Sequence, residues 1–181
     1  MGLTNDERTR VLALATDAVS AAVCGGPAPE SPSDGAFGEK RGCFVTLKNH
    51  GRLRGCIGVF EAHRPLGQMV AQMARAAATE DTRFASNPVT PGELPELSVD
   101  VSVLSELVAT DDPLSLRLGV DGIYIVQGGR SGCFLPEVAT ETGWDAETFL
   151  RECCGGKAFL SPDAWRDSET TVYLFTSEKI P

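Results

Sequence analysis

The stretch "CFVTLKNHGRLRGCIGVF", residues 43–60, contains two strand-like segments separated by a turn signal. Residues 43–48 and 52–60 are rich in β-branched, aromatic and other apolar side chains, which is typical of strands. The tripeptide "NHG" between them suits a three-residue hairpin loop with Gly51 in the left-handed conformation. The stretch therefore predicts an antiparallel hairpin.

The three-residue loop sets the cross-strand register of this hairpin. On one face it pairs Lys48 with Arg52, Thr46 with Arg54, and Phe44 with Cys56. The other face then carries only apolar side chains, which are Cys43, Val45, Leu47, Leu53 and Ile57. This register predicts a cationic strip that ends at a free thiol on one shared surface.

The motif "LRGCIG", residues 53–58, concentrates charge, thiol and glycine in six residues. A guanidinium at Arg54 favours the thiolate of Cys56, and Gly55 and Gly58 permit a bulge or the close approach of a ligand. The motif therefore predicts a small anion-accepting site beside a thiol. In the alternative interpretation, Cys56 is a buried apolar residue, the glycines make room for the helix that begins near Pro65, and Arg54 pairs with a structural carboxylate.

The segment "EDTRF", residues 80–84, follows the second predicted helix. Asp81 could accept hydrogen bonds from Arg54, or Arg83 could enlarge the cationic site. The alternative is that Asp81 and Arg83 cap the helix and pair with each other locally.

The N-terminal half of the chain predicts two helices. A capping box formed by Thr4 and Glu7 begins a helix over residues 5–24, and Pro65 begins another with a single apolar stripe. Between them, residues 25–40 are rich in Gly, Pro and Ser and are expected to form an exposed, mobile loop.

The rest of the chain predicts more strands than helices. Thr90, Pro91 and Glu93 are expected to form a short capped turn of helix. A strand over residues 97–104 follows, whose Ser98, Asp100 and Ser102 are expected to face outward. The later elements are a hairpin of residues 122–127 and 131–136 that turns at Gly128 and Gly129, a helix over 145–154, a helical turn in "SPDAW" and a strand over 170–175. The order indicates an α+β fold with a mainly antiparallel sheet.

Composition restricts the class of protein. The chain has 181 residues, enough for one domain, and a net charge of −9, which argues against a nucleic-acid or anionic-membrane partner. No apolar run approaches the ~20 residues that cross a bilayer, and the N-terminus lacks the pattern of a secretory signal, so a cytoplasmic protein is expected. Six cysteines without a C-x-x-C pair indicate free thiols, and no metal or other cofactor is expected.

In order and spacing, several segments resemble the AMMECR-type domain family, whose bacterial and archaeal members are called AmmeMemoRadiSam system protein A. They include "CFVTLKNHGRLRGCIGVFEAHRPL", "AAATEDTRFASNPVTPGEL" and "DGIYIVQGGRSGCFLPEVATETGWDAETFL", and the likeness runs from about Leu12 to Phe175. The matched motif residues are Arg54, Gly55, Cys56, Gly58, Asp81, Arg83, Phe84, Pro136 and Trp144. Two positions depart from the family pattern: Thr82 replaces a proline, which alters the local turn, and Phe159 replaces a glycine, which is expected to fill space near a helix end.

The resemblance implies one AMMECR-type domain over residues 1–181, with a larger lobe that carries the sheet, a smaller lobe beside it, and the motif near the cleft between them. It also implies two partners, a Memo-like protein of the extradiol-dioxygenase type and a radical-SAM enzyme.

Three functional hypotheses follow. The first is an accessory binding module that holds a small anion or an acidic partner segment at Arg54, Gly55, Cys56, Gly58 and Arg83. The second is an enzyme with Cys56 as nucleophile and Asp81 orienting a proton donor or water. The third gives the motif a structural role only.

Overall fold

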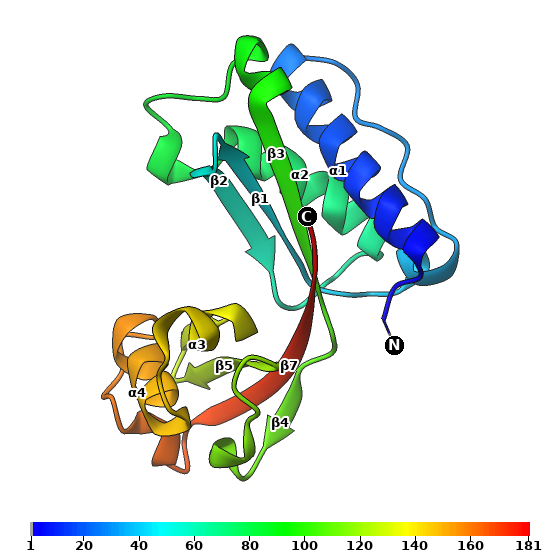
Figure 1. Cartoon of the computed structure of the whole chain (residues 1–181). Helices are drawn as coiled ribbons and strands as arrows, with labels where there is room; N and C mark the ends of the chain where they lie inside the picture. Colours follow the sequence, from blue (N-terminus) through cyan, green and yellow to red (C-terminus); the bar gives the residue numbers. More distant parts are fainter. Residues whose placement is uncertain (1) are drawn as a thin grey trace. The chain divides into compact units, whose positions relative to one another are not determined.

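The computed structural model describes residues 2–181 (Figure 1). The α-helices are α1 (Asn5–Cys24), α2 (Leu66–Thr79), α3 (Pro136–Thr142) and α4 (Ala146–Gly156). The strands are β1 (Cys43–Asn49), β2 (Arg52–Val59), β3 (Leu97–Leu104), β4 (Val108–Thr110), β5 (Asp121–Gln127), β6 (Arg130–Phe134) and β7 (Thr171–Ile180). The strand order is β2-β1-β3-β7-β5-β6, with β4 paired to β7. Strand β1 pairs antiparallel with β2 and β3, and β5 pairs antiparallel with β6 and β7, as does β4 with β7, which confirms the α+β class with a mainly antiparallel sheet.

The chain forms two compact units. The first contains the described residues up to Leu104 together with Glu178–Pro181, and the second is Ser105–Ser177. Among residues 2–181, no helix combines the length and the apolar character that a bilayer crossing requires.

In the first unit, α1 and α2 cover one face of β1, β2 and β3 (Figure 1). The predicted capping box begins α1, where Glu7 N–H donates to the hydroxyl of Thr4. The apolar stripe of α2 is buried as predicted, through Leu66, Met69, Val70, Met73, Ala74 and Ala77. These side chains pack against the apolar face of β1 and β3. The helical spacing of apolar residues in the sequence was therefore enough to identify the buried face of α2.

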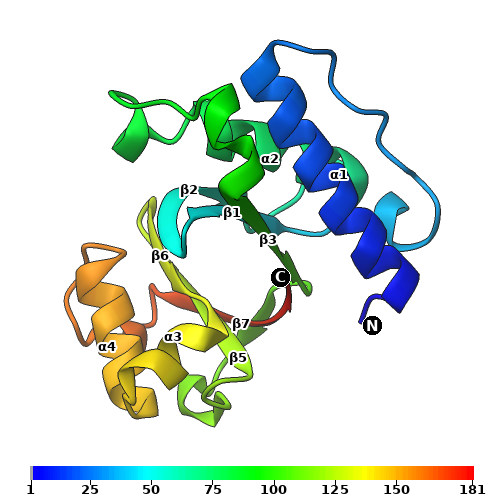
Figure 2. The same cartoon turned by 45° about the horizontal axis from the view of Figure 1, so that its top comes forward.

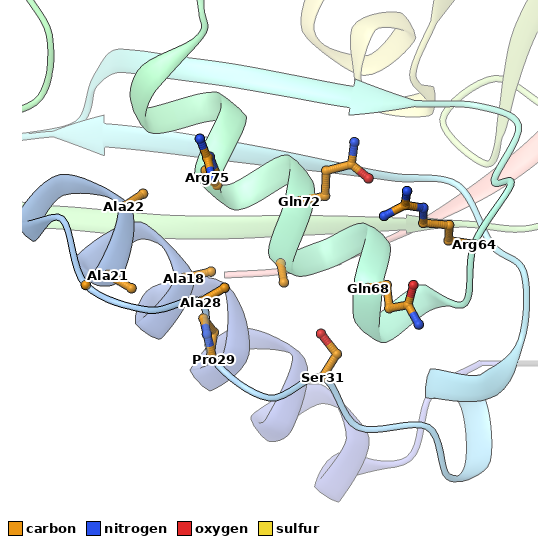
Figure 3. Close-up of a pocket in the computed structure, with 12 residues that line it drawn as sticks. Ala18, Ala21, Ala22, Ala28, Pro29, Ser31, Arg64, Gln68, Gln72 and Arg75 are labelled. Carbon is orange, nitrogen blue, oxygen red and sulfur yellow. The ribbon is translucent and has the colours of Figure 1, made fainter.

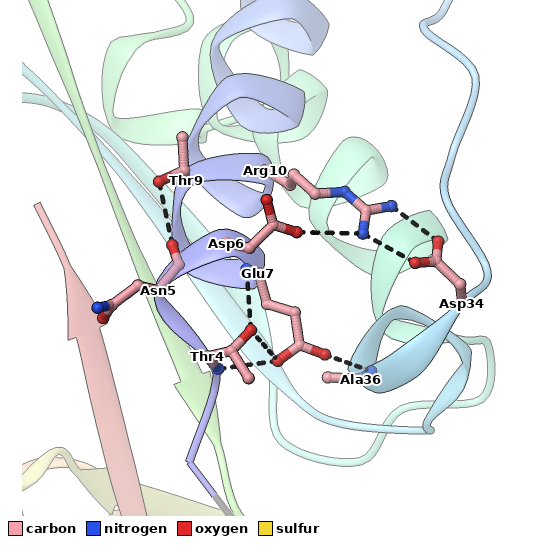
Figure 4. A network of polar contacts seen from close by, with 8 residues as sticks. All are labelled: Thr4, Asn5, Asp6, Glu7, Thr9, Arg10, Asp34 and Ala36. Carbon is pink, nitrogen blue, oxygen red and sulfur yellow. Dashed lines mark hydrogen bonds and ion pairs between the residues drawn. The ribbon is translucent and has the colours of Figure 1, made fainter.

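The segment of residues 25–40, between α1 and β1, is largely exposed, but it is anchored to α1. Arg10 donates to both carboxylate oxygens of Asp34, and the carboxylate of Glu7 accepts from the N–H of Ala36 (Figure 4). Phe37, in the 3₁₀ helix η1 (Gly35–Gly38), is fully buried under the Arg10 guanidinium. The prediction of an exposed loop is therefore wrong for Phe37, because an isolated aromatic among glycines gives no periodic signal.

The polar residues of β3 are also more buried than predicted. They alternate with the apolar ones, but Asp100 and Ser102 are both at most 9% exposed. Asp100 lies opposite Thr46 of β1, and Lys48 donates to its carboxylate at 2.8 Å. Of the three side chains predicted to face outward, Ser98 is exposed. The prediction of an outward, exposed position is wrong for Asp100 and Ser102, and for Asp100 the neighbouring strand β1 supplies the polar partner, Lys48.

The second unit packs α3 and α4 against β5 and β6 (Figure 2). The hairpin turns at Gly128 and Gly129, both at positive φ, as predicted. Asp145 caps α4 through the N–H of Thr148. Helix α3, which begins at Pro136, was not predicted.

Candidate functional site

The turn of the first hairpin is shorter than predicted. Asn49 pairs with Arg52, so the loop is only His50 and Gly51, with φ of 46° and 77°. Two consecutive residues at positive φ are the signature of a type I′ turn, whose twist matches that of the flanking strands. The prediction of a three-residue loop is therefore wrong.

A β-bulge then shifts the register a second time. Lys48 pairs with Leu53 but Leu47 pairs with Gly55, so Arg54 is the extra residue on β2. Beyond the bulge, the cross-strand pairs are Thr46 with Cys56 and Phe44 with Gly58. The predicted partners of Lys48, Thr46 and Phe44, which were Arg52, Arg54 and Cys56, are all wrong, because the turn and the bulge each move the partner by one residue.

Arg54 is buried and ion-paired rather than part of an exposed strip. It is 7% exposed, and its Nε and Nη2 donate to the two carboxylate oxygens of Glu93 at 2.7 and 3.2 Å. Glu93 lies in the 3₁₀ helix η3 (Pro91–Glu96), and its carboxylate also accepts from the N–H of Thr90. Arg54 holds the pKa of Glu93 down at about 2. The sequence identified Glu93 only as a capping residue.

Asp81 and Arg83 form a second arginine–carboxylate unit, here called the Asp81–Arg83 clasp. The N–H and Nε of Arg83 donate to Oδ1 of Asp81, and Nη2 donates to Oδ2 at 2.6 Å. This local pairing is one of the two predicted alternatives, and Asp81 does not pair with Arg54.

The clasp also binds the backbone of Cys56 in β2, which is an end strand of the sheet. Oδ2 of Asp81 accepts from the Cys56 N–H at 2.8 Å, and Nη2 of Arg83 donates to the Cys56 carbonyl at 3.1 Å. The two side chains therefore replace a neighbouring strand at this residue.

Asp81 is held as an anion. Its hydrogen bonds to Arg83 lower the pKa of Asp81 to about 2, and the same pairing raises the pKa of Arg83. A carboxylate in this state accepts hydrogen bonds from N–H donors, but it carries no proton to give near neutral pH.

The thiol of Cys56 is half-buried on the sheet face opposite α1 and α2. Its Sγ lies 3.2 Å from the hydroxyl of Thr46, and either atom can donate. Thr46 is flanked on β3 by Asp100, which Lys48 neutralises. The polar face predicted for Thr46, Lys48 and Cys56 therefore exists, but Arg54 does not add its charge to it.

Both motif glycines lie where a side chain would not fit. A Cβ at Gly55 would collide with the carbonyl oxygen of Ala77 near the end of α2. A Cβ at Gly58 would collide with the ring of Phe44 and the carbonyl oxygen of Cys43. Gly55 thus makes room for the C-terminal end of α2, rather than for its start near Pro65.

A hollow of about 380 Å³ adjoins the second half of the motif. Ile57, Gly58 and Val59 of β2 line one side, and residues of α2, including Arg75, line the other. The second half of the motif therefore lines a surface hollow, next to Cys56, whose backbone the clasp binds.

The remaining matched residues lie in the second unit. The ring of Trp144 packs against that of Phe134 at 5.9 Å between centroids, and Pro136 is the first residue of α3. Phe159 has φ of 54° and is 77% exposed. The expectation that Phe159 fills space near the helix end is wrong.

Thr82, the other position that departs from the family pattern, lies in the first unit. Thr82 begins the short helix η2 (Thr82–Phe84) directly after Asp81.

The residues 2–181 contain no group of three or more His, Cys, Asp and Glu side chains arranged to hold a metal ion.

Comparison with known proteins gives a consistent result. The AMMECR1 family model matches residues 12–180. A protein of Methanothermobacter thermautotrophicus is 42% identical over 97% of this chain and 94% of its own length. Protein TK0174 of Thermococcus kodakarensis is 44% identical over 84% of this chain and 77% of its own length. The crystal structure of the uncharacterized protein PH0010 from Pyrococcus horikoshii matches with a TM-score of 0.86 and 36% identity, over 98% of this chain and 92% of that one.

Proposed function

Because the chain belongs to the AMMECR1 family, we propose that it is an accessory binding module that holds a small anion beside the LRGCIG motif. The anion carries a carboxylate or phosphate group. In this proposal the module serves the oxidative chemistry of a Memo-like protein and a radical-SAM enzyme, the two partners that the sequence resemblance implies.

One observation carries the proposal: two guanidinium groups lie against one aromatic ring. The Cζ atoms of Arg54 and Arg83 are 5.7 and 5.8 Å from the ring centroid of Phe84. Arg54 Nη1 is buried and has no hydrogen-bond partner. A buried N–H without an acceptor is costly, and an anionic oxygen is the acceptor that guanidinium groups bind most strongly.

The carboxylates of Glu93 and Asp81 fix the orientation of these guanidinium groups. Glu93 binds Nε and Nη2 of Arg54, and Asp81 binds Nε and Nη2 of Arg83. Arg54 is enclosed, whereas the Arg83 side chain is 54% exposed and reachable by a ligand. Such preorganisation lowers the entropic cost of binding.

The geometry gives less support to a thiol enzyme. The Cys56 thiol contacts the hydroxyl of Thr46 and interacts with the guanidinium of Arg83. Neither group is a base that could take the thiol proton, as a histidine could. Asp81 has its oxygens occupied by Arg83 and by the Cys56 N–H, so it is poorly suited to orient a proton donor. The packing of Gly55 and the clasp favour a purely structural role for the motif. The test must therefore distinguish anion binding from this structural role.

The test is titration of the full chain with inorganic phosphate and with succinate, by calorimetry and by NMR of the backbone amides. Arg83→Gln is the informative variant, because Arg83 is half exposed. Arg117→Gln is the matched control: Arg117 binds Asp121 through the same N–H, Nε and Nη2 set, and its side chain is 66% exposed.

We expect one of the two anions to shift the amide signals of Arg54, Arg83 and Phe84. Arg83→Gln should weaken that binding at least tenfold, and Arg117→Gln should leave it unchanged. The proposal fails if neither anion shifts these signals, or if both variants weaken binding equally. If a glutamate-rich peptide binds and neither small anion does, the proposal of a small ligand is wrong, and the site binds an acidic segment of a partner instead.

A further inference from the structure

A second hollow lies in the first unit, away from the motif. It has a volume of about 310 Å³ and lies between α1, the segment that follows it, and α2 (Figure 3). Its wall is made largely of small apolar residues, among them Ala18, Ala22, Ala28, Pro29 and Ala71. This volume is at the lower end of the range of small-molecule sites, and an apolar wall is what such sites typically offer.

Four long polar side chains border the apolar wall. They are Arg64, just before α2, and Gln68, Gln72 and Arg75 along α2 (Figure 3). Their spacing of three or four residues puts them on one side of the helix. The described residues that line the hollow include no acidic side chain. The border can therefore donate hydrogen bonds from two guanidinium and two amide groups to one ligand.

The two arginines of this border lack the close carboxylate that several other arginines of the chain have. Arg10, Arg83 and Arg117 each bind a carboxylate through two nitrogens. Within residues 2–181, Arg64 has no ion pair or hydrogen bond. Arg75 reaches Glu80 only at 3.7 Å, with both side chains more than half exposed, and such a pair contributes little.

Arg64 has no ion pair within residues 2–181, and the pair of Arg75 with Glu80 is long and exposed. These two positive charges beside an apolar hollow, on a chain of net charge −9, favour a ligand that joins an anionic group to a hydrocarbon body. We propose that this hollow binds a small amphipathic carboxylate. The hydrocarbon body lies against the alanines of α1 and α2, and the carboxylate accepts hydrogen bonds from Arg64 and from the amides of Gln68 and Gln72.

Arg54, Arg83 and Phe84, which carry the anion site proposed at the motif, do not line this hollow. Arg75 and Gln72 line both hollows, so variants at these two residues would not separate the proposals. Arg64 and Ala71 line only the hollow between α1 and α2, and they are the positions to change.

The experiment compares three probes that share one hydrocarbon chain: octanoate, octanol and octylamine. Each is titrated into the full chain and followed by calorimetry and by amide NMR. Arg64→Gln removes the charge at an exposed position, and Ala71→Leu fills the hollow from a half-buried position. Arg52→Gln is the matched control, because Arg52 is exposed, makes no ion pair within residues 2–181, and lies outside the hollow.

We expect octanoate to bind at least tenfold more tightly than octanol, and octylamine to bind least. Amide shifts should map to residues 18–31 and to α2. Arg64→Gln and Ala71→Leu should each weaken octanoate binding at least fivefold, and Arg52→Gln should not. Equal binding of octanoate and octanol would overturn the charge assignment. No octanoate binding, or shifts confined to other elements, would overturn the site.

Discussion

The two hairpins β1–β2 and β5–β6 share more features than their sequences suggest. Both turn through two residues at positive φ, His50–Gly51 and Gly128–Gly129. Both second strands carry a glycine followed by a cysteine, Gly55–Cys56 and Gly132–Cys133. In each, a Cβ on the glycine would collide with backbone of another element, which is Ala77 for the first hairpin and Ala158 for the second.

The differences lie in what surrounds this shared pattern. The register of β5–β6 is unbroken, whereas β1–β2 has the bulge at Arg54. Burial raises the pKa of the Cys133 thiol to about 11, which is typical of an inert structural thiol. Between the two hairpins, β2 is the strand whose backbone is bound by the side chains of an acid and an arginine, at Cys56. The comparison indicates that the glycine–cysteine pair is a packing feature, and that Arg54 and the clasp are what distinguish the first hairpin.

The largest expected effect is common to both hairpins. Gly55→Ala and Gly132→Ala should each lower the free energy of unfolding by at least about 2 kcal/mol, because the new methyl meets backbone that cannot move aside cheaply. Urea denaturation measures this change. Gly156→Ala is the control: nothing lies near its Cβ and it is in a helix, so no loss is expected. A tolerated Gly55→Ala would contradict the packing role and return Gly55 to the ligand site.

The next effect separates the hairpins. Arg54→Lys should destabilise the protein by about 2 kcal/mol. Arg54 binds both carboxylate oxygens of Glu93 in a buried position, and a lysine has a single nitrogen for this pairing. Arg130→Lys should cost less than about 0.5 kcal/mol, because Arg130 is exposed and donates only to the Phe159 carbonyl. Thermal and urea unfolding of both variants provide the measurement. Equal losses of stability would show that Arg54 is no more important to its hairpin than Arg130 is to the other.

A smaller, pH-dependent effect sharpens the same distinction. The folded pKa of Glu93 is about 2, below the ~4.3 of an unfolded glutamate. The unfolded state therefore binds more protons, so this contribution to stability is present above about pH 4 and is lost as the pH falls towards 2. Glu93→Gln should be less stable near neutral pH and show a shallower acid loss, measured by denaturation across a pH series. Parallel pH curves for the variant and the wild type would contradict the linkage.

The smallest effect concerns the turns. His50→Asn should raise the free energy of unfolding by a few tenths of a kcal/mol, because asparagine adopts positive φ more readily than histidine. The lost contact between His50 and Glu96 is exposed and contributes little. Gly128→Asn should have a comparable small effect on the other hairpin. Destabilisation of more than about 1 kcal/mol by His50→Asn would be inconsistent with a turn-only role for this residue.

Local patterns in the sequence were sufficient for most of the fold. The apolar stripe of α2, the cap at Thr4 and the turn at Gly128–Gly129 are set by neighbours a few residues apart, and all three were predicted. The bulge at Arg54 was not, because inserting one residue into a ladder leaves the two-residue alternation of the strand looking intact.

The predicted site was least accurate where partners are distant in sequence. Arg54 and Glu93 are 39 positions apart, and the capping box at Thr90 already accounted for Glu93. The pairing of Asp81 with Arg83 was predicted as an alternative because it spans two residues. Its bond to the Cys56 backbone was not, since a main-chain group has no sequence signature.

The clasp also bears on how the protein behaves at high concentration. An end strand with free N–H and C=O groups is a template on which another chain can add, and natural proteins suppress that reaction. Side chains of Asp81 and Arg83 occupy both groups of Cys56, so a foreign strand would first have to displace two charged hydrogen bonds. The clasp therefore makes the middle of β2 a poorer template for an added strand.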